Sequence, residues 1–322
     1  MLLAFFFLSR YDKNYTTERG FFMTLQQLKY VTAVAGTGTI SGAAQALFLS
    51  QPSLTAAIRE LEQELNITIF SRTNRGVVLT AAGEEFLGYA RQVLEQTDLI
   101  EERYTGSAPR RHRFSVSTQH YSFAVEAFVD LLKEYGGPEY DFRIRETKTY
   151  EIIEDVSRLR SEVGLLYLNE FNRPVLTRVL REHELEFHPL FTARPHVFVS
   201  KANPLAERRA LTLDDLAPYP RLSYEQGEHN AFYFSEEILS TLECDKEIMV
   251  SDRATLFNLL IGLNGYTICS GVINNELNGP NITAVPLDVD DCMEIGYLLH
   301  KRTVPNRFTE AYLDALRRHT GD

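Results

Sequence analysis

Two helical periods separated by a very short break, within residues 41–65, constrain this chain more than any other stretch. In the second period, large aliphatic side chains recur at steps of four, three and four residues, at Leu54, Ile58, Leu61 and Leu65. That spacing places them on one face of a helix. Ser50 is a suitable N-cap, and Pro52 falls in the first turn, where a missing N–H costs nothing. The stretch predicts a helix-turn-helix whose second helix offers its N-terminal residues to the major groove of DNA.

One helix is expected before this pair and a two-stranded wing after it. Thr24 can cap a helix with Leu25, Leu28 and Val31 on its inner face. Two weak β segments, near residues 67–70 and 77–79, enclose a basic tip that contains Arg72 and Arg75. Arginine at such a tip can pair with phosphates or enter the minor groove, whereas the alternative is a solvated turn.

A long helix is expected from Thr80 to about Tyr104. Its apolar stripe alternates steps of four and three residues and comprises Phe86, Ala90, Val93, Thr97, Ile100 and Tyr104. A narrow stripe of this kind suits pairing with a second helix, although it can also pack on its own domain. Residues 106–113 follow as a hinge, because they contain Gly, Ser and Pro.

The ordered motifs of this region resemble those of LysR-type transcriptional regulators. The matching residues are Ala43-Ala44-x-x-Leu47, Ser50-Gln51-Pro52-Ser53, Ile58-x-x-Leu61-Glu62, Ile69-Phe70-x-Arg72 and Leu79-Thr80-x-Ala82-Gly83. The resemblance implies double-stranded promoter or operator DNA as a partner. It also implies dimers formed through the long helix, a tetramer formed through the effector domains, and contact with RNA polymerase.

Base readout is expected from the start of the second helix of the motif. Gln51 can bond an adenine edge, Pro52 and Thr55 can contact a thymine methyl, and Ser50 and Ser53 can bond phosphate or cap the helix. Ala56 stands where many relatives have Arg, so the arginines carry more of the electrostatics. The expected DNA-binding residues are Ser50, Gln51, Pro52, Ser53, Thr55, Arg59, Arg72 and Arg75.

From Phe114 onward, short apolar strands alternate with helical periods, which predicts a parallel sheet with helices on both faces. The region also resembles the LysR-type effector domain, an α/β two-lobed domain similar to a type 2 periplasmic binding protein. The expected domains are a winged helix-turn-helix (23–80), a dimerising linker helix (81–105), a hinge (106–113) and an effector-binding domain (114–322). Within the last, lobe 1 is expected to comprise residues 114–195 and 270–322, and lobe 2 residues 196–269.

An effector site is expected between the two lobes. Ser117, Thr118, Gln119 and His120 end a strand and open a helix, where hydroxyl and free N–H groups suit an anion. The residues expected opposite them are Tyr224, Gln226, Asp252, Arg253, Tyr266 and Ser270. Helix capping by Ser117 and Thr118, and a partly exposed His120, remain as alternatives. We expect a small polar effector, anionic in character.

Composition limits the other possibilities. The chain has 322 residues and a formal net charge of -11, which by itself argues against a nucleic-acid binder, but residues 23–80 are near neutral. Cys244, Cys269 and Cys292 are widely spaced and fit free thiols in a reducing cytoplasm. Residues 1–22 are expected to be an extension of doubtful origin before a natural start at Met23, with no membrane role.

No catalytic motif suggests an enzyme. The sequence has no Gly-x-Ser-x-Gly elbow, no Walker-type phosphate loop and no Gly-x-Gly-x-x-Gly, so we expect no catalytic residue, cofactor or metal. Two alternatives stay open. One is an enzyme fused to a DNA-binding or protein-interaction domain, and the other is a solute-binding receptor whose N-terminal helices bind protein.

Overall fold

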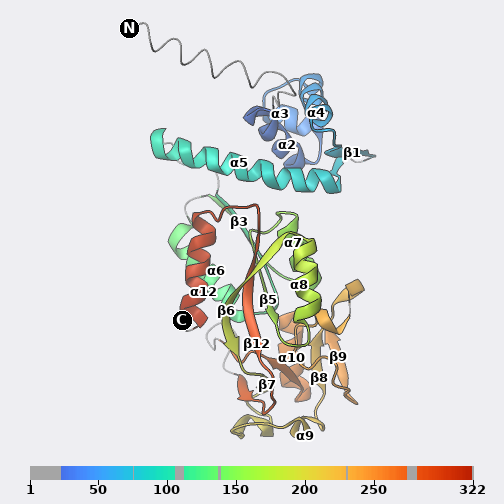
Figure 1. Cartoon of the computed structure of the whole chain (residues 1–322), viewed down its shortest axis with the longest axis vertical. Helices are drawn as coiled ribbons and strands as arrows, with labels where there is room; N and C mark the ends of the chain where they lie inside the picture. Colours follow the sequence, from blue (N-terminus) through green and yellow to red (C-terminus); the bar gives the residue numbers. More distant parts are fainter. Residues whose placement is uncertain are drawn as a thin grey trace. The chain divides into compact units, whose positions relative to one another are not determined.

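The computed structural model describes residues 23–74, 76–105, 112–136, 139–229, 231–273 and 281–320. The extension 1–22, Arg75 and most of the predicted hinge therefore lie outside the described residues. The chain forms two compact units, Met1–Pro109 and Arg110–Asp322 (Figure 1). Within the described ranges, no helix is long and apolar enough to cross a membrane.

The N-terminal unit is helical with a two-stranded wing. Its elements are α2 (Leu25–Thr37), α3 (Ile40–Ala46), α4 (Gln51–Leu65), β1 (Phe70–Thr73), β2 (Gly76–Leu79) and α5 (Ala81–Thr105). Thr24 and Gln27 form a capping box before α2, and the hydroxyl of Ser50 accepts a bond from Ser53 N at the start of α4. The predicted caps are therefore the observed ones. Ala43 and Ala44 are buried against Leu54 and Ile58, so small side chains bring α3 and α4 together.

Two side chains of the helix-turn-helix region fix the wing. Glu62 Oε1 accepts hydrogen bonds from the backbone N–H groups of Ile69 (2.7 Å) and Phe70 (3.1 Å), which ties the end of α4 to the start of β1. The Thr80 hydroxyl accepts a bond from Gly83 N (2.9 Å) at the start of α5. These contacts explain why Glu62, Thr80 and Gly83 occur at their positions in the motif.

The C-terminal unit has two five-stranded sheets. The first has the order β4-β3-β5-β12-β6 and the second β11-β7-β10-β8-β9. The strands of the first sheet are β3 (His112–Thr118), β4 (Tyr140–Glu146), β5 (Val163–Leu168), β6 (Leu185–Ala193) and β12 (Met293–His300). Those of the second are β7 (His196–Ser200), β8 (Arg221–Tyr224), β9 (Glu247–Val250), β10 (Tyr266–Cys269) and β11 (Ile282–Pro286).

Helices cover both faces of the first sheet. They are α6 (Ser122–Tyr135), α7 (Thr149–Ser157), α8 (Arg173–Glu182) and α12 (Arg307–Thr320). Side chains of α6 and α12 share one core cluster, and those of α7 and α8 share another (Figure 1). The second lobe carries α9 (Leu213–Leu216), α10 (Arg253–Leu263) and the 3-10 turns η1 (Pro204–Glu207), η2 (Gly227–His229) and η3 (Phe232–Phe234).

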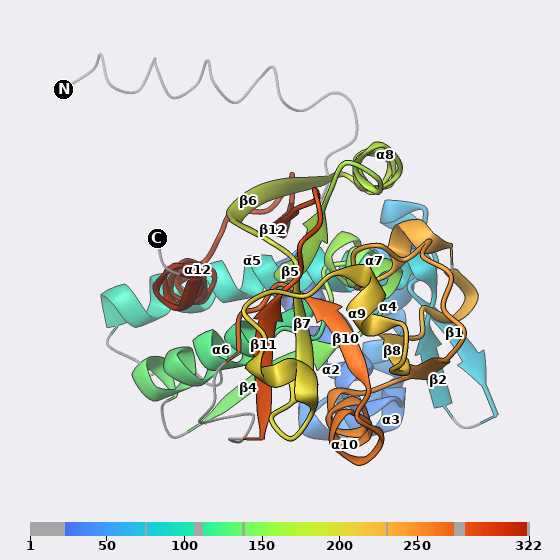
Figure 2. The same ribbon diagram turned by 90° about the horizontal axis from the view of Figure 1, so that it is seen from below.

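Two expectations about the sheets were wrong. Both sheets are mixed, because β12 runs antiparallel to β5 and β6, and β7 runs antiparallel to β10 and β11. Residues 282–286 were assigned to lobe 1, but β11 pairs with β7 in the second sheet (Figure 2). The chain therefore returns to lobe 1 between Pro286 and Met293, not at residue 270.

Gly83 offers a test of the packing between α5 and the wing. A Cβ at position 83 would lie 2.1 Å from the carbonyl oxygen of Ile69, whereas a Cβ at Gly36 in α2 would meet nothing within 4 Å. Gly83→Ala should lower the stability of the N-terminal unit by about 1–3 kcal/mol through forced displacement of the backbone. Gly36→Ala should raise it by up to about 1 kcal/mol through helix propensity. Thermal denaturation of both variants measures the difference, and a gain in both would contradict the packing argument.

Candidate DNA-binding surface and effector cavity

The first turn of α4 is exposed along most of its polar side. Ser50, Gln51, Pro52, Ser53 and Arg59 are exposed, and Thr55 is half-buried. The Ser50 and Ser53 hydroxyls lie 2.7 Å apart, while the Thr55 hydroxyl donates to Gln51 O at 2.8 Å. The Gln51 side chain is exposed at the first residue of the helix. Arg72 is exposed on β1, and Arg75 lies outside the described residues.

The second candidate site is a small cavity between the two lobes, with a volume of about 50 Å³. Its first-lobe side is built by the turn between β3 and α6, by the first residue of α6, and by Met293 of β12. Its second-lobe side comes mainly from β7, β8, α10 and β10 and from the residues after β10. The lining side chains used below are His120, Tyr121, Tyr224, Glu236, Glu237 and Arg253.

The turn after β3 is held by a buried amide. Gln119 Nε2 donates to Thr149 Oγ1 at 2.6 Å, and Gln119 Oε1 accepts from Tyr121 OH at 2.7 Å and from Tyr167 N at 3.2 Å. Thr118 is fully buried and its hydroxyl donates to Gln119 O at 2.7 Å. Both side chains therefore shape the turn that presents His120 and Tyr121 to the cavity.

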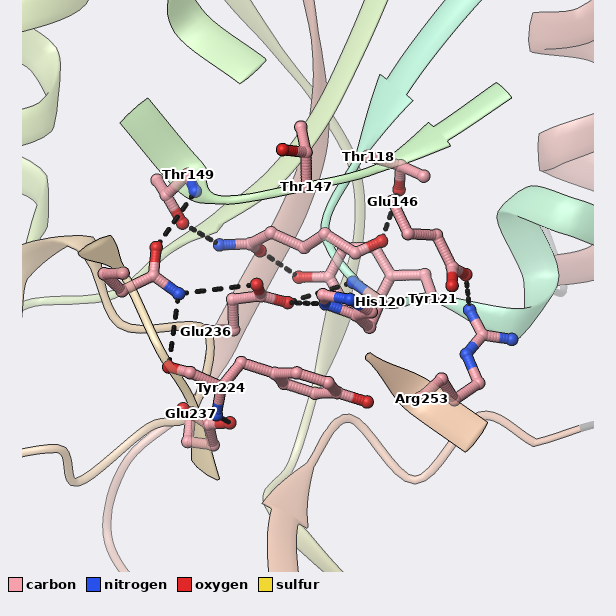
Figure 3. A network of polar contacts seen from close by, with 12 residues as sticks. Thr118, His120, Tyr121, Glu146, Thr147, Thr149, Tyr224, Glu236, Glu237 and Arg253 are labelled. Atoms are coloured by element: carbon pink, nitrogen blue, oxygen red, sulfur yellow. Dashed lines mark hydrogen bonds and ion pairs between the residues drawn. The ribbon is translucent and has the colours of Figure 1, made fainter. Parts of the chain in front are cut away.

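Glu236 joins the two lobes. Its Oε2 accepts from His120 N at 2.9 Å and lies 2.8 Å from His120 Nδ1, and its Oε1 lies 3.4 Å from Gln226 Nε2 (Figure 3). The ring of His120 stacks on Tyr224, with centroids 3.7 Å apart and planes 3° from parallel. A first-lobe imidazole is thus enclosed by a carboxylate and an aromatic ring of the second lobe.

Further polar contacts cross between the lobes. Thr149 N donates to Gln226 Oε1 at 3.0 Å. Glu146 at the end of β4 forms an ion pair with Arg253 at the start of α10 (Figure 3). Lys148 Nζ lies 3.6 Å from Glu225 Oε1. The structure therefore presents the two lobes in a closed, hydrogen-bonded arrangement.

A segment between β8 and β9, residues 227–229 and 231–240, reaches across to the first lobe, and we call it the strap. His229 stacks on Tyr150 with centroids 3.6 Å apart, and Tyr233 stacks on Phe171 at 4.7 Å. Phe234 is buried in the core cluster built by α7 and α8. The backbone oxygen of Glu237 accepts from Tyr167 OH at 3.1 Å. Contacts with first-lobe side chains thus position Glu236 and Glu237, which belong to the second lobe.

Of the ten residues expected at the effector site, six line the cavity or support its walls, and three lie away from it. His120, Tyr224, Arg253 and Ser270 line it, while Gln119 and Gln226 support its walls. Ser117 faces α7 instead, where its hydroxyl donates to Asp155 Oδ2 at 2.6 Å. Asp252 is exposed and caps α10 by accepting from Thr255 N, and Tyr266 is buried beside Cys244. The remaining one, Thr118, supports the turn beneath the cavity.

Glu236 and Glu237 are charged cavity residues that the sequence analysis did not indicate. Both are buried, with exposed fractions of 7% and 3%. Burial, and next the neighbouring Glu236 carboxylate, raise the pKa of Glu237 to about 8, so its carboxyl group is mostly protonated at neutral pH. Burial likewise raises the pKa of the Cys269 thiol, another lining residue, to about 12, so this thiol is not a reactive thiolate.

Glu237 should make stability depend on pH. In the unfolded chain its carboxyl ionises at a lower pH than in the folded protein, so folding stability falls as pH rises from the usual glutamate range to about 8. Glu237→Gln removes this penalty, and the gain in melting temperature over the parent protein should be larger at pH 8 than at pH 5. Glu228→Gln, at an exposed strap position, is the matched control and should give no such trend. Equal gains for Glu237→Gln at both pH values would contradict the raised pKa.

Two domain families match the chain. Residues 25–84 match the bacterial regulatory helix-turn-helix proteins of the lysR family, and residues 116–321 match the LysR substrate binding domain. The second match alone spans more than half of the chain.

Individual relatives and a solved structure agree with these matches. The HTH-type transcriptional regulator YnfL of Escherichia coli (strain K12) is 31% identical over 213 residues, which are 65% of this chain and 68% of YnfL. AlsR of Bacillus subtilis (strain 168) is 27% identical over 243 residues, 75% of this chain and 77% of AlsR. A full-length variant of OxyR from Pseudomonas aeruginosa has the same fold, with a TM-score of 0.60 at 21% identity, over 92% of this chain and 98% of OxyR.

The helix-turn-helix, the two-lobed α/β domain and these matches lead to one assignment. This chain belongs to the LysR family and is a DNA-binding transcriptional regulator with a substrate-binding domain, not an enzyme.

Proposed function

We propose that this regulator recognises promoter or operator DNA with the first turn of α4, and that the wing contacts the backbone beside it. The observation that carries the proposal is the exposed Gln51 side chain at a capped helix start, flanked by Ser50 and Ser53. Glutamine can form two hydrogen bonds with an adenine edge, and hydroxyls at a helix N-terminus suit phosphate. Such a protein acts in the cytoplasm, where the DNA is. Selection of bound genomic fragments by the purified protein tests this proposal.

The effector is a small polar metabolite that binds in the cavity between the lobes. The closed arrangement supports this role, because His120, Glu146 and Thr149 of one lobe meet Glu236, Arg253 and Gln226 of the other. A ligand that binds the closed lobes better than the open ones shifts the equilibrium toward closure. Closure would then change the spacing of the DNA-binding pairs, and with it promoter bending and contact with RNA polymerase.

Dimers form through the second half of α5, and effector domains pair to give a tetramer. In the stripe of α5, Ala90 is buried in its own unit, whereas Val93, Ile100 and Tyr104 have exposed fractions of 43%, 60% and 83%. Exposed apolar side chains at heptad spacing support pairing with the same helix of a second copy.

Replacement of Gln51 should separate specific from non-specific DNA binding. Gln51→Ala should weaken binding to a selected fragment by about 1–3 kcal/mol, because two base contacts are lost. Binding to unrelated DNA should hardly change, because it depends on phosphate contacts. Gln63→Ala, at an exposed position in the last turn of the same helix, is the control. Gel-shift titrations that showed an equal loss on both DNAs would remove Gln51 from base readout.

A charge placed in the α5 stripe should weaken the dimer. Ile100→Lys introduces an ammonium group where the proposal places an apolar seam, and desolvation of that group disfavours pairing. Sedimentation should show a larger monomer fraction at a given concentration. Asp98→Asn changes the net charge by the same amount at an exposed position outside the stripe, and it should leave the distribution unchanged. An unchanged distribution for Ile100→Lys would place the interface elsewhere.

A further inference from the structure

Phe48, in the turn between α3 and α4, is almost fully exposed to solvent. Its exposed fraction is 97%, the highest among the large apolar side chains of the described residues. A single exposed apolar residue is common on protein surfaces and needs no explanation by itself. At this position, however, the backbone conformation adds a second unfavourable contribution to the free energy of folding.

The backbone of Phe48 is left-handed, with a φ of 56°. This conformation brings Cβ close to the following carbonyl oxygen, so it disfavours every residue except Gly and, to a smaller extent, Asn and Asp. Leu159 and Leu239 are also left-handed, but both are half-buried, so packing offsets part of their strain. Phe48 has no such compensation, because its ring is exposed.

The turn itself requires the left-handed conformation at position 48. Leu49 N donates to Ala44 O at 2.9 Å, which closes the end of α3. Phe48 N donates to Gln45 O at 3.2 Å. These two bonds form a Schellman motif, whose left-handed position is usually occupied by Gly or Asn. A strained and exposed phenyl ring lowers stability on both counts, which indicates that the ring acts on something outside this fold.

Phe48 lies next to the surface to which we assign DNA binding. Two peptide units separate it from the N-cap Ser50, so their Cα atoms lie within about 7.6 Å of each other. In the proposed function, the first turn of α4 enters the major groove, which is about 12 Å wide. A residue this close to the helix start then lies at the edge of the groove, beside the DNA backbone. The neighbouring exposed residues are Ser50, Gln51, Pro52 and Ser53.

We infer that Phe48 contacts DNA, and that its ring packs against deoxyribose carbons of the strand beside the groove that α4 enters. This inference rests on the proposed function of α4. A phenyl ring has no charge to pair with phosphate, but it gains free energy by burying apolar surface of the sugar. Because every nucleotide carries the same sugar, the contact adds affinity without selecting a sequence. Arg59 is the one basic residue of α4, so an uncharged contact has a larger relative effect here.

Stability and DNA binding should change in opposite directions when the ring is removed from the full-length protein. Phe48→Asn relieves the left-handed strain, so the melting temperature of the N-terminal unit should rise by about 4 °C or more. Thermal denaturation measures this change. A lower melting temperature would show that the ring stabilises the protein itself, and it would overturn the inference.

Gel-shift titrations with a selected genomic fragment and with an unrelated duplex measure the DNA contact. Phe48→Asn and Phe48→Gly should each bind both DNAs about tenfold more weakly, because the lost contact is the same for any sequence. The slope of log affinity against log salt should stay that of the parent protein, because no charge is removed. Arg59→Ala should instead reduce that slope by about one, which distinguishes a phosphate contact from a sugar contact.

Two further variants separate the ring from other effects. Phe48→Tyr keeps both the ring and the left-handed strain, so its affinity and melting temperature should match those of the parent protein. Val304→Asn replaces another strongly exposed apolar side chain, 83% exposed in the effector unit, and should leave DNA binding unchanged. Sedimentation of Phe48→Asn should show the oligomer distribution of the parent protein.

Three results would overturn the inference. The first is unchanged DNA affinity of Phe48→Asn and Phe48→Gly, which would assign the ring to a protein partner. The second is a shift of Phe48→Asn toward monomer, which would assign it to a second copy of this chain. The third is a loss on the selected fragment alone, which would make the contact one with a base. If the parent protein bound no DNA at all, the proposed function of α4 would fail, whereas normal binding by the parent and by both variants removes only the role of Phe48.

Discussion

A carboxylate buried between two lobes has to find its hydrogen-bond donors there, and Glu236 finds them in both. It accepts from His120 N of the first lobe and lies within reach of Gln226 Nε2 of the second. Gln226 in turn accepts from Thr149 N, so the first-lobe turns after β3 and β4 are tied to one pair of contacting side chains, Glu236 and Gln226. Removing any member leaves a buried polar group unpaired, which costs more than the lost bond itself. The closed arrangement therefore depends on the whole network being present.

The strap carries Glu236, so this network also depends on the side-chain packing that holds the strap in place. It has little regular structure of its own, because η2 and η3 are single short turns. Its position comes from side chains, with His229 and Tyr233 stacked on first-lobe rings and Phe234 in the core beside α7 and α8. A segment held by side chains opens at lower cost than a strand within a sheet. Separation of the lobes would thus break two ring stacks, expose Phe234 and disrupt the carboxylate network together, which favours two discrete states over gradual opening.

The sequence patterns correctly predicted the structural features that depend on interactions between residues close together in the chain. The caps at Thr24 and Ser50 and the helical faces all depend on neighbours within a few residues. The strap glutamates were missed because two adjacent acids suggest an exposed turn, whereas the apolar residues on both sides of them, Phe232–Phe234 and Ile238–Leu239, indicate burial. Ser117 was expected in the cavity, but its partner Asp155 is 38 residues away. The sheet that β11 joins depends on pairing with β7 across more than 80 residues, and nothing within Ile282–Pro286 indicates it.

The acidic composition and the DNA-binding role are compatible because charge acts locally. A net charge of -11 is spread over 322 residues, and many of the carboxylates lie in the effector unit, where several are engaged by Arg145, Arg160, Arg173 or Arg253. In the N-terminal unit, Glu62 directs its carboxylate at the backbone N–H groups of Ile69 and Phe70 rather than at solvent. Few basic side chains accompany α4, so counterion release contributes less here than in a strongly basic domain. In the proposed mode of DNA binding, hydrogen bonds from Gln51, Ser50 and Ser53 and the proposed pairing of two copies would then have to supply a larger share of the affinity.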